Sequence, residues 1–532
     1  MFKINMKKKS IFSTWKNDLP ASLVVYLVAL PLCLGVAFAS TDVDGVDGMP
    51  NIFSGIIAGF VGGIVVGALS GSRLGVSGPA AGLITIVAGA LATLGSFEGL
   101  ILAVFLSGLI QLIAGYLKLG VIGHYFPSSV IKGMLAAIGL TLILKEIPHI
   151  LGYDKEPMGD MDINHADGHN TFSDILYAYE HFTMGAVIIG ILSLGILILF
   201  ERPFMKRIAL FKYLPGALFV VVTGIVINQL FGWYAPELQL TGEHLVLLPI
   251  AKSFDEVIHI FNTPDFSLLS NPNVYIIAFT LAIVGSLESL LSVEATDKLD
   301  PMKNVTPTNR ELKAQGVGNM VSGLIGGLPI TQVIVRSSAN INSGAKSKLS
   351  AITHGVILII SVLLIPGVLN MIPLASLGAI LLMVGYKLAK VSLFKSMYKL
   401  GWEQFLPFIV TIGVVLATDL LKGIGAGMIV AIFFILRKNY KNDYNRKVIQ
   451  EGEKEVIHIS LSEEVTFLNK GSIIQTLDNL PENSKVVLDG SKCQDINYDV
   501  LEAIEEFRQF NAIQKNIELS TINIPVVKLT GH

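Results

Sequence analysis

Long apolar runs separated by short polar connections dominate the chain up to about residue 440. A helix needs roughly 20 apolar residues to cross the hydrocarbon core of a bilayer. The pattern predicts fourteen such segments and hence an all-α polytopic membrane protein, with the segment near 312–326 the most polar of them. The segments lie near residues 21–40, 51–70, 76–95, 99–117, 129–146, 184–201, 213–232, 273–293, 312–326, 330–343, 350–370, 374–389, 405–421 and 424–437.

Two segments are interrupted by Gly and Pro, and each is third in its half when the fourteen are divided seven and seven. The interruptions are Val76-Ser77-Gly78-Pro79-Ala80-Ala81-Gly82 and Gly326-Gly327-Leu328-Pro329-Ile330-Thr331-Gln332. An odd number of spans per half predicts an inverted repeat, and paired interrupted segments indicate a transport site. Each interruption frees the N-terminus of a short helix, whose N–H groups suit an anion. We therefore predict a transporter of a small anion.

Charge in the connections predicts the orientation of the chain. Basic residues, from Lys7-Lys8-Lys9 to Arg437, gather in alternate short connections, whereas acidic residues such as Asp42 and Glu237 occupy the others. Short basic connections stay in the cytoplasm, so both termini are predicted to be cytoplasmic. The first apolar run, residues 21–39, is too long for a cleaved signal peptide and is predicted to be a retained span in the cell (plasma or inner) membrane.

Composition agrees with a membrane protein and argues against other classes. Of 532 residues, 52% are apolar and 15% are charged, and the mean hydropathy is +0.63. Soluble domains carry about 25% charged residues. The net charge of −2 gives no reason to expect a nucleic-acid partner. Because no Walker A, His-Glu-x-x-His or Gly-x-Ser-x-Gly motif occurs, we predict neither an enzyme nor an ATP-driven pump, and we expect no cofactor.

After Asn439 the pattern becomes that of a small soluble α/β domain. Residues 458–461, 485–489 and 516–524 read as strands, and 471–480 and 497–514 read as helices. The predicted organisation is an N-terminal segment 1–20, a membrane domain 21–438, a linker 439–454 and a cytoplasmic α/β domain 455–532. A domain of this size is near the lower limit for an independent core, so we expect it to use a partner surface.

Glu288 is a carboxylate within the otherwise apolar segment 273–293. Ionisable side chains at membrane depth are costly and usually functional. Glu288 could bind the coupling ion, H⁺ or Na⁺, with the Ser292 hydroxyl one helical turn further on as a second oxygen. The alternative is a structural ion pair with Arg336 that joins the two halves.

Arg336 follows Pro329 by seven residues, roughly 10 Å along a helix. Its guanidinium could add positive charge behind the two helix ends, or it could extend to the membrane interface.

Two other polar stretches have simpler explanations. Thr308 and Glu311 fit a capping box. The loop from His149 to His181 contains further His and Asp residues. A metal site there is conceivable, but the spacing matches no ligand pattern, so we prefer an acidic outer loop and predict no metal site.

The chain resembles the SulP (sulfate permease) family of inorganic anion transporters over almost its whole length. The most specific stretches are Asn309-Arg-Glu-Leu-Lys-Ala-Gln-Gly-Val-Gly-Asn319, Gly326-Gly-Leu-Pro-Ile-Thr331 and Arg336-Ser-Ser-Ala-Asn340; Val76-Ser-Gly-Pro-Ala80 and Leu30-Pro31 match the first half. The resemblance implies fourteen spans in a seven-plus-seven inverted repeat of the uracil-permease type, a homodimer, and a cytoplasmic STAS domain that is shortened here.

The resemblance also implies an anion site between the starts of the third and tenth segments. Glu288 and Ser292 match positions that hold Na⁺ in bicarbonate-transporting members. Those members carry a small residue in place of Gln332 and Thr in place of Ile334, a difference that favours H⁺ over Na⁺ here. The implied anion-binding residues, with Arg336, are Leu32, Cys33, Pro79, Ala80, Ala81, Thr331, Gln332, Val333, Ile334 and Val335.

The family transports sulfate, bicarbonate, chloride and dicarboxylates, and the sequence leaves sulfate and bicarbonate open. Residues 292–301 look like a bacterial subgroup sometimes joined to carbonic anhydrase, which suggests bicarbonate and that enzyme as a partner. The Ser that is phosphorylated in related STAS proteins is absent after Asp495, so dimerisation or docking is favoured over a phosphorylation switch. The alternatives are an anion channel, exchanger or sensor of this family, or a nucleobase or carboxylate carrier of the same fold.

Overall fold

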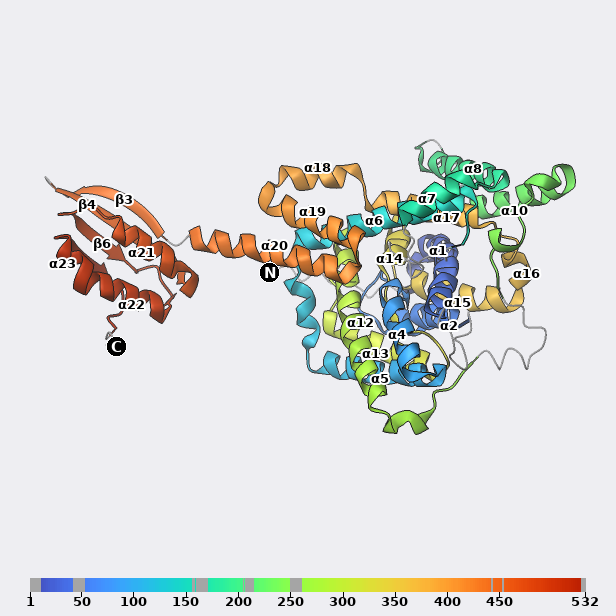
Figure 1. The fold of residues 1–532 in the computed structure, drawn as a ribbon, viewed down its shortest axis with the longest axis horizontal. Helices are drawn as coiled ribbons and strands as arrows, with labels where there is room; N and C mark the ends of the chain where they lie inside the picture. The colour runs from blue at the N-terminus through green and yellow to red at the C-terminus, as the bar shows by residue number, and fades with distance from the viewer. Residues whose placement is uncertain are drawn as a thin grey trace. The chain divides into compact units, whose positions relative to one another are not determined.

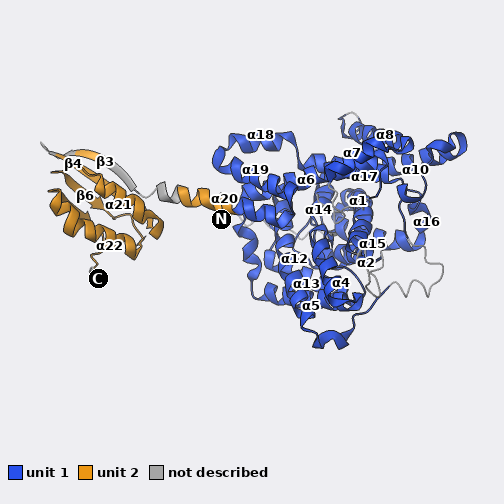
Figure 2. Cartoon of the chain, viewed as in Figure 1, with its two compact units in different colours: residues 1–428 blue, residues 429–532 orange. Residues whose placement is uncertain are grey.

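The computed structural model describes residues 11–41, 53–155, 158, 171–203, 205, 215–248, 261–441, 444–451 and 454–527. The chain divides into two compact units, residues 1–428 and 429–532 (Figure 2).

The first unit is a bundle of helices, and the following belong to its first half. The α-helices are α1 (Trp15–Thr41), α2 (Phe53–Val61), α3 (Gly67–Leu69), α4 (Ile84–Leu94), α5 (Phe97–Tyr116), α6 (Ser128–Leu151), α7 (Thr171–Glu180), α8 (Met184–Glu201) and α10 (Gly216–Tyr234). A π-helix, η2 (Gly62–Val66), joins α2 to α3. The 3-10 turns are η1 (Ile11–Thr14), η3 (Ala81–Leu83), η4 (Leu119–Tyr125), η6 (Pro236–Leu238), η7 (Gly242–His244) and η8 (Phe266–Ser270).

The second half of the bundle begins after η8. Its helices are α12 (Pro272–Leu299), α13 (Thr308–Leu324), α14 (Ile334–Asn342), α15 (Leu349–Leu364), α16 (Pro366–Leu369), α17 (Leu374–Leu388), α18 (Val391–Lys399), α19 (Trp402–Ala417) and α20 (Leu420–Lys441). Each of the fourteen predicted apolar segments overlaps one or more of the helices of the two halves. In Figure 1, α5, α12 and α13 lie side by side.

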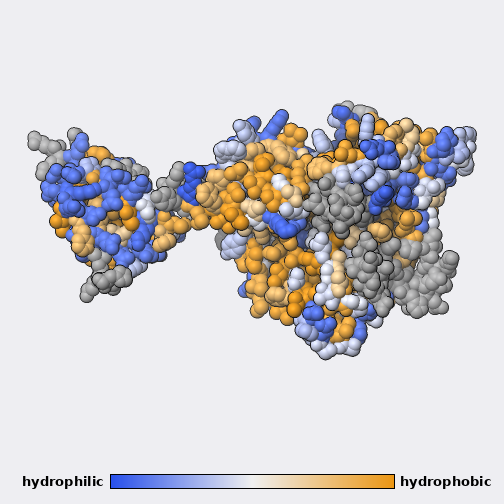
Figure 3. Space-filling model, in the orientation of Figure 1, coloured by the Kyte–Doolittle hydropathy of each residue, from blue (hydrophilic) through white to orange (hydrophobic). Residues whose placement is uncertain are grey.

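The bundle has the composition of a protein embedded in lipid. Among the described residues, seven stretches of helix are long and apolar enough to cross a membrane: α1, α5, α8, α10, α12, α20 and the stretch Leu374–Lys399. Four shorter apolar stretches accompany them, Phe53–Leu69, Ala81–Leu94, Leu349–Leu364 and Trp402–Ala417. Apolar side chains cover much of the visible face of this unit (Figure 3).

The polar helix α13 differs from its prediction at its start. It begins at Thr308, but the capping box expected there is not formed, because the N-cap is Pro307 and no side chain caps it. Glu311 is fully buried instead, and its carboxylate accepts hydrogen bonds from Ser70 Oγ and from Gln315 Nε2, the latter at 2.9 Å.

The second unit holds a four-stranded sheet with the order β3-β4-β6-β8. Strands β4, β6 and β8 are parallel to one another, whereas β3 is antiparallel to β4. Buried Ile459, Leu488 and Ile504 belong to its core. Its elements are β3 (Tyr444–Glu451), β4 (Lys454–Leu461), β5 (Glu464–Val465), η9 (Phe467–Asn469), α21 (Lys470–Asp478), β6 (Lys485–Asp489), β7 (Asp495–Ile496), α22 (Tyr498–Glu506), η10 (Phe507–Asn511), α23 (Ala512–Gln514) and β8 (Glu518–Ile522).

The linker expected at 439–454 contains regular structure. Residues up to Lys441 continue α20, and Tyr444–Glu451 form β3, which pairs with β4 along its whole length. The sequence prediction missed β3 because only three of its eight residues are apolar and they show no alternation.

Candidate functional site

The two interrupted segments meet as a short antiparallel strand pair. Strand β1 (Ser77–Pro79) pairs with β2 (Ile330–Gln332), so that Ser77 faces Gln332, Gly78 faces Thr331 and Pro79 faces Ile330. The pairing continues where Val333 N–H donates to Val76 O at 2.9 Å. All six strand residues are buried.

A helix starts directly after each of these strands. Turn η3 and then α4 follow β1, with Ala80 at the N-cap, and α14 follows β2, with Val333 at the N-cap. Neither N-cap side chain accepts a hydrogen bond from the helix. An apolar N-cap leaves N–H groups of the first turn without a side-chain partner, and these groups carry the positive end of the helix dipole.

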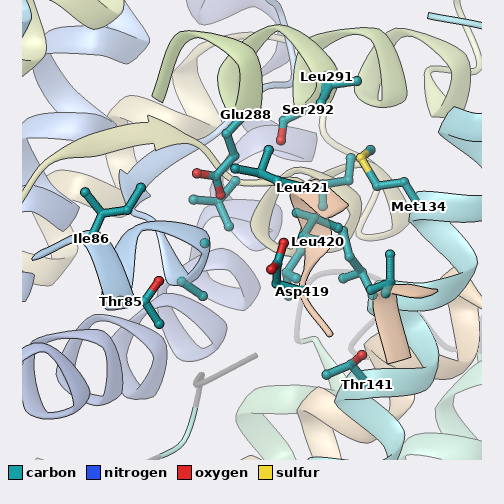
Figure 4. A pocket seen from close by; sticks show the side chains of 17 residues that line it. Thr85, Ile86, Met134, Thr141, Glu288, Leu291, Ser292, Asp419, Leu420 and Leu421 are labelled. Carbon is teal, nitrogen blue, oxygen red and sulfur yellow. The ribbon is translucent and has the colours of Figure 1, made fainter. Parts of the chain in front are cut away.

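Both helix starts open into one cavity of about 240 Å³ (Figure 4). The wall opposite them comes from α6 and from the junction of α19 with α20. The cavity is lined by Ala81, Gly82, Thr85, Ile86, Met134, Ile138, Thr141, Glu288, Leu291, Ser292, Val333, Ile334, Val335, Val415, Asp419, Leu420 and Leu421.

The structure places some of the predicted site residues in this cavity. Ala81, Val333, Ile334 and Val335 line it, as do both predicted coupling residues, Glu288 and Ser292. The remaining predicted residues are buried nearby without lining it: Leu32, Cys33, Pro79, Ala80, Thr331, Gln332 and Arg336.

Two of the predicted residues that do not line the cavity belong to β2. Gln332, which is 1% exposed, donates from Nε2 to Thr296 Oγ1 on α12 at 3.0 Å. Thr331 is fully buried, and no described residue forms a hydrogen bond with its Oγ1. Neither side chain is among those that line the cavity.

Arg336 lies behind the strand pair rather than in the cavity. Its side chain is fully buried, Nη2 lies 3.3 Å from Cys33 Sγ, and Nε and Nη1 have no hydrogen-bond partner in the described part of the chain. Full burial rules out the extension to the membrane interface, and no ion pair with Glu288 is found among the described residues. A guanidinium without a paired carboxylate leaves positive charge close behind both helix starts.

Gly78 permits this position of the guanidinium. A Cβ atom at Gly78 would lie 2.0 Å from Arg336 Nη1. A side chain at position 78 would force the guanidinium to shift, so glycine allows the charge to approach β1 this closely.

Glu288 reaches the cavity from α12. Its Oε2 atom is buried and has no hydrogen-bond partner among the residues that the structure describes. Its Oε1 atom would lie 3.2 Å from a Cβ at Gly82, in the first turn after β1. The carboxylate therefore lies against the helix start that is best suited to an anion.

Polar side chains of α13 hold the strand pair. Asn319 accepts from Ile330 N–H at 2.6 Å and donates to Ile330 O at 3.0 Å and to Gln111 Oε1 at 2.8 Å. One turn earlier, Gln315 donates to Ser77 Oγ at 2.8 Å. Asn319 thus pairs both backbone groups of Ile330, which point away from β1 because Pro79 and Ile330 form a non-hydrogen-bonded pair in this register.

The sequence prediction missed the residues of the opposite wall. Met134 and Thr141 on α6 and Asp419 at the start of α20 line the cavity. The Thr418-Asp419 pair within an apolar stretch is a signal that could have identified this helix junction.

Asp154, in the loop after α6, is hydrogen-bonded to two histidines from other elements, His149 at the end of α6 and His244 in η7, and the described part of the chain contains no metal-binding group. Asp154 accepts from His149 Nδ1 and His244 Nδ1, each at 2.7 Å. His165 and His169 lie outside the described residues.

Comparisons with known proteins agree with this architecture. A model of the Sulfate permease family matches residues 15–411. The putative sulfate transporter YvdB of Bacillus subtilis is 27% identical over 80% of this chain and 74% of its own length. The bicarbonate transporter BicA of Picosynechococcus is 26% identical over 80% of this chain and 71% of its own length.

Two solved structures share the fold. The transmembrane domain of a cyanobacterial bicarbonate transporter BicA aligns with a TM-score of 0.52 at 23% identity, covering 79% of this chain and 98% of that one. The structure of SLC26A9 aligns with a TM-score of 0.66 at 17% identity, covering 97% of this chain and 86% of that one.

Helices of membrane-spanning length, with two interrupted segments paired beside a cavity, define a polytopic integral membrane protein of the transporter class. The chain belongs to the Sulfate permease family. Its relatives are named as transporters rather than as enzymes.

Proposed function

We propose that the protein is a secondary active transporter of a small inorganic anion, sulfate or bicarbonate, coupled to H⁺ or Na⁺. The observation that carries this proposal is the convergence of two helix N-termini without side-chain caps on one cavity that also contains Glu288. The names of the relatives, which include sulfate and bicarbonate transporters, support the choice of anion. The residues that bind the anion are Ala81, Val333, Ile334 and Val335, through the helix starts to which they belong.

Glu288 couples the anion to a cation in this proposal. Its carboxylate lies beside Gly82, so an ionised Glu288 competes with the anion for the same helix start. A proton on Glu288 removes the competing charge, and anion and proton then occupy the cavity together. Na⁺ would find the Glu288 carboxylate and the Ser292 hydroxyl but no oxygen on the Ile334 side chain, so we favour H⁺.

The wider architecture of this proposal follows the family pattern. The membrane domain has fourteen spans in a seven-plus-seven inverted repeat, with both termini in the cytoplasm. The protein works as a homodimer, and its C-terminal STAS-like unit serves as a docking or dimerisation surface. The paired strands move as one block against the α6–α19–α20 wall to change the side on which the cavity opens.

Uptake by proteoliposomes under imposed ion gradients tests the coupling role. Radiolabelled sulfate and bicarbonate are offered to the unmodified protein and to Glu288→Gln at matched amounts of folded protein. We expect the substitution to abolish uptake driven by a pH or Na⁺ gradient, because glutamine cannot exchange a proton. Uptake by the variant that still follows either gradient would remove Glu288 from the coupling.

Glu294→Gln is the matched control for this experiment. Glu294 lies on the same helix but pairs with Lys298 Nζ at 3.3 Å and does not line the cavity. This variant should retain uptake that depends on the gradient. Absence of uptake of any inorganic anion by the unmodified protein would refute the proposed function itself.

A further inference from the structure

A third helix N-terminus reaches the cavity, and it comes from the opposite wall. Helix α20 starts at Leu420, and Asp419, Leu420 and Leu421 all line the cavity. The chain changes direction just before, where Thr418 has φ −138° and ψ −99°. Three helix starts, those after β1 and β2 and that of α20, therefore share one small space.

The third start differs from the other two because a carboxylate caps it. Asp419 Oδ1 accepts a hydrogen bond from Lys422 N–H, in the first turn of α20, at 2.8 Å. Asp419 Oδ2 is paired with Lys422 Nζ at 2.8 Å. An N–H donor and an ammonium group together hold a carboxylate in its charged form, so Asp419 offsets the dipole that α20 would otherwise present.

Asp419 thus places a fixed negative charge in a cavity that is proposed to bind an anion. Among the described residues, the ionisable side chains that line the cavity are Glu288 and Asp419, and Figure 4 shows both directed into the same space. Glu288 has a buried oxygen without a partner, whereas both oxygens of Asp419 are engaged. A proton can therefore neutralise Glu288 during transport while the charge of Asp419 persists.

We propose that Asp419 sets the charge selectivity of the cavity, favouring singly charged over doubly charged anions. The inference rests on the proposed function, and it selects bicarbonate over sulfate. Coulomb energy scales with the charge of the ligand, so one fixed negative charge penalises a doubly charged anion twice as strongly as a singly charged one. Lys422, whose side chain is 72% exposed, moderates the penalty.

The test uses two substitutions that move the charge in opposite directions. Asp419→Asn removes the charge and keeps the cap, since Asn caps helices as well as Asp does. Lys422→Gln removes the ammonium group and leaves the negative charge of the Asp419 carboxylate without its positively charged partner. The full-length protein is reconstituted, and uptake of whichever labelled anion it transports is inhibited with unlabelled sulfate and unlabelled bicarbonate at one pH. The readout is the ratio of the two half-inhibiting concentrations.

We expect Asp419→Asn to shift this ratio by about threefold or more towards sulfate, and Lys422→Gln to shift it towards bicarbonate. Asp265→Asn is the matched control, because Asp265 caps η8 in the same manner and does not line the cavity. It should leave the ratio unchanged. A ratio that stays constant in Asp419→Asn, or that moves in the same direction in both variants, would overturn the inference while leaving anion transport established.

Discussion

At the scale of single residues, the absence of a side chain at position 78 matters as much as the charge at position 336. The guanidinium of Arg336 approaches β1 more closely than any Cβ would allow, and it has no carboxylate partner among the described residues. A buried charge of this kind is costly unless its field is used. The guanidinium lies behind two helix starts. We infer that the unfavourable free energy of burying it is offset in function, because its positive charge attracts the anion.

This arrangement predicts the effect of Gly78→Ala. The added methyl group would displace the guanidinium, which weakens the field at the helix starts and strains the strand pair. We expect at least a tenfold loss of apparent affinity for the transported anion and a destabilisation of about 1–3 kcal/mol, as for overpacking in a core. Substrate-dependent uptake and thermal unfolding in detergent measure the two effects.

Gly89→Ala provides the comparison, since a Cβ there meets nothing within 4 Å. This variant should bind and unfold like the unmodified protein. Unchanged affinity in Gly78→Ala would show that the position of Arg336 is not important for the anion.

The residue scale is also where prediction from the sequence was least complete. The sequence could predict which segments lie at the site, because the interruptions identify the segments that contribute Val333 and Ala81. The sequence could not predict which side chains point into the cavity. Successive side chains of a strand point to opposite faces, and the sequence alone did not locate β2. Gln332 was therefore assigned to the cavity, although its amide contacts Thr296.

At the scale of elements, α13 explains why one predicted span appeared too polar. Glu311, Gln315, Asn319 and Ser322 follow each other at helical spacing and are all buried. The last three each hydrogen-bond a partner within an interrupted segment, and Glu311 accepts from Ser70, which precedes the first of these segments. The polar residues thus supply the pairing that broken helices lose at membrane depth, and they are not a sign of a solvated connection.

Asn319→Ala tests this role of α13. The substitution leaves both backbone groups of Ile330 without their side-chain partner, at a cost of about 1–3 kcal/mol for each unsatisfied buried group. We expect uptake per folded molecule to fall at least tenfold, because β2 positions the start of α14. Uptake normalised to the folded fraction is the measurement.

Asn228→Ala is a chemically matched control. Asn228 binds the backbone of Leu240 in the same two-point manner, with 2.7 and 3.0 Å contacts, but does not line the cavity. It should lose stability to a similar extent and retain uptake per folded molecule. Equal loss of uptake in both variants would mean that α13 contributes to stability alone.

At the scale of the whole molecule, the sequence predicted a helical membrane protein followed by a C-terminal α/β region, because hydropathy and strand alternation depend on local composition. It did not predict which connections meet. The contact between His244, in η7, and Asp154, after α6, joins residues of two separate connections. Such contacts depend on the three-dimensional path of the chain, which no local pattern encodes.

That contact predicts a pH dependence of stability. The hydrogen bond to Asp154, opposed in part by burial, raises the pKa of His244 above its ordinary value near 6.5. A raised pKa in the folded state means that the stabilisation is complete below the unfolded pKa and is lost as the pH rises through the folded pKa. We expect His244→Gln to lower stability by about 1 kcal/mol or less at pH 5.5, and by progressively less above pH 7.

Thermal unfolding of both proteins between pH 5.5 and 8.5 provides the measurement. The gap between their midpoints should narrow as the pH rises. A constant gap would show that His244 contributes through packing rather than through its proton.

The pairing of Ser77 with Gln332 also constrains how the protein is made. When only the first half of the chain has been synthesised, β1 is present and β2 is not. Strand β1 therefore has no partner strand at that stage. Residues 77–79 therefore lack their partner strand until β2 has been synthesised, and we expect a chain that ends between the halves to lack the strand pair on which the proposed site depends.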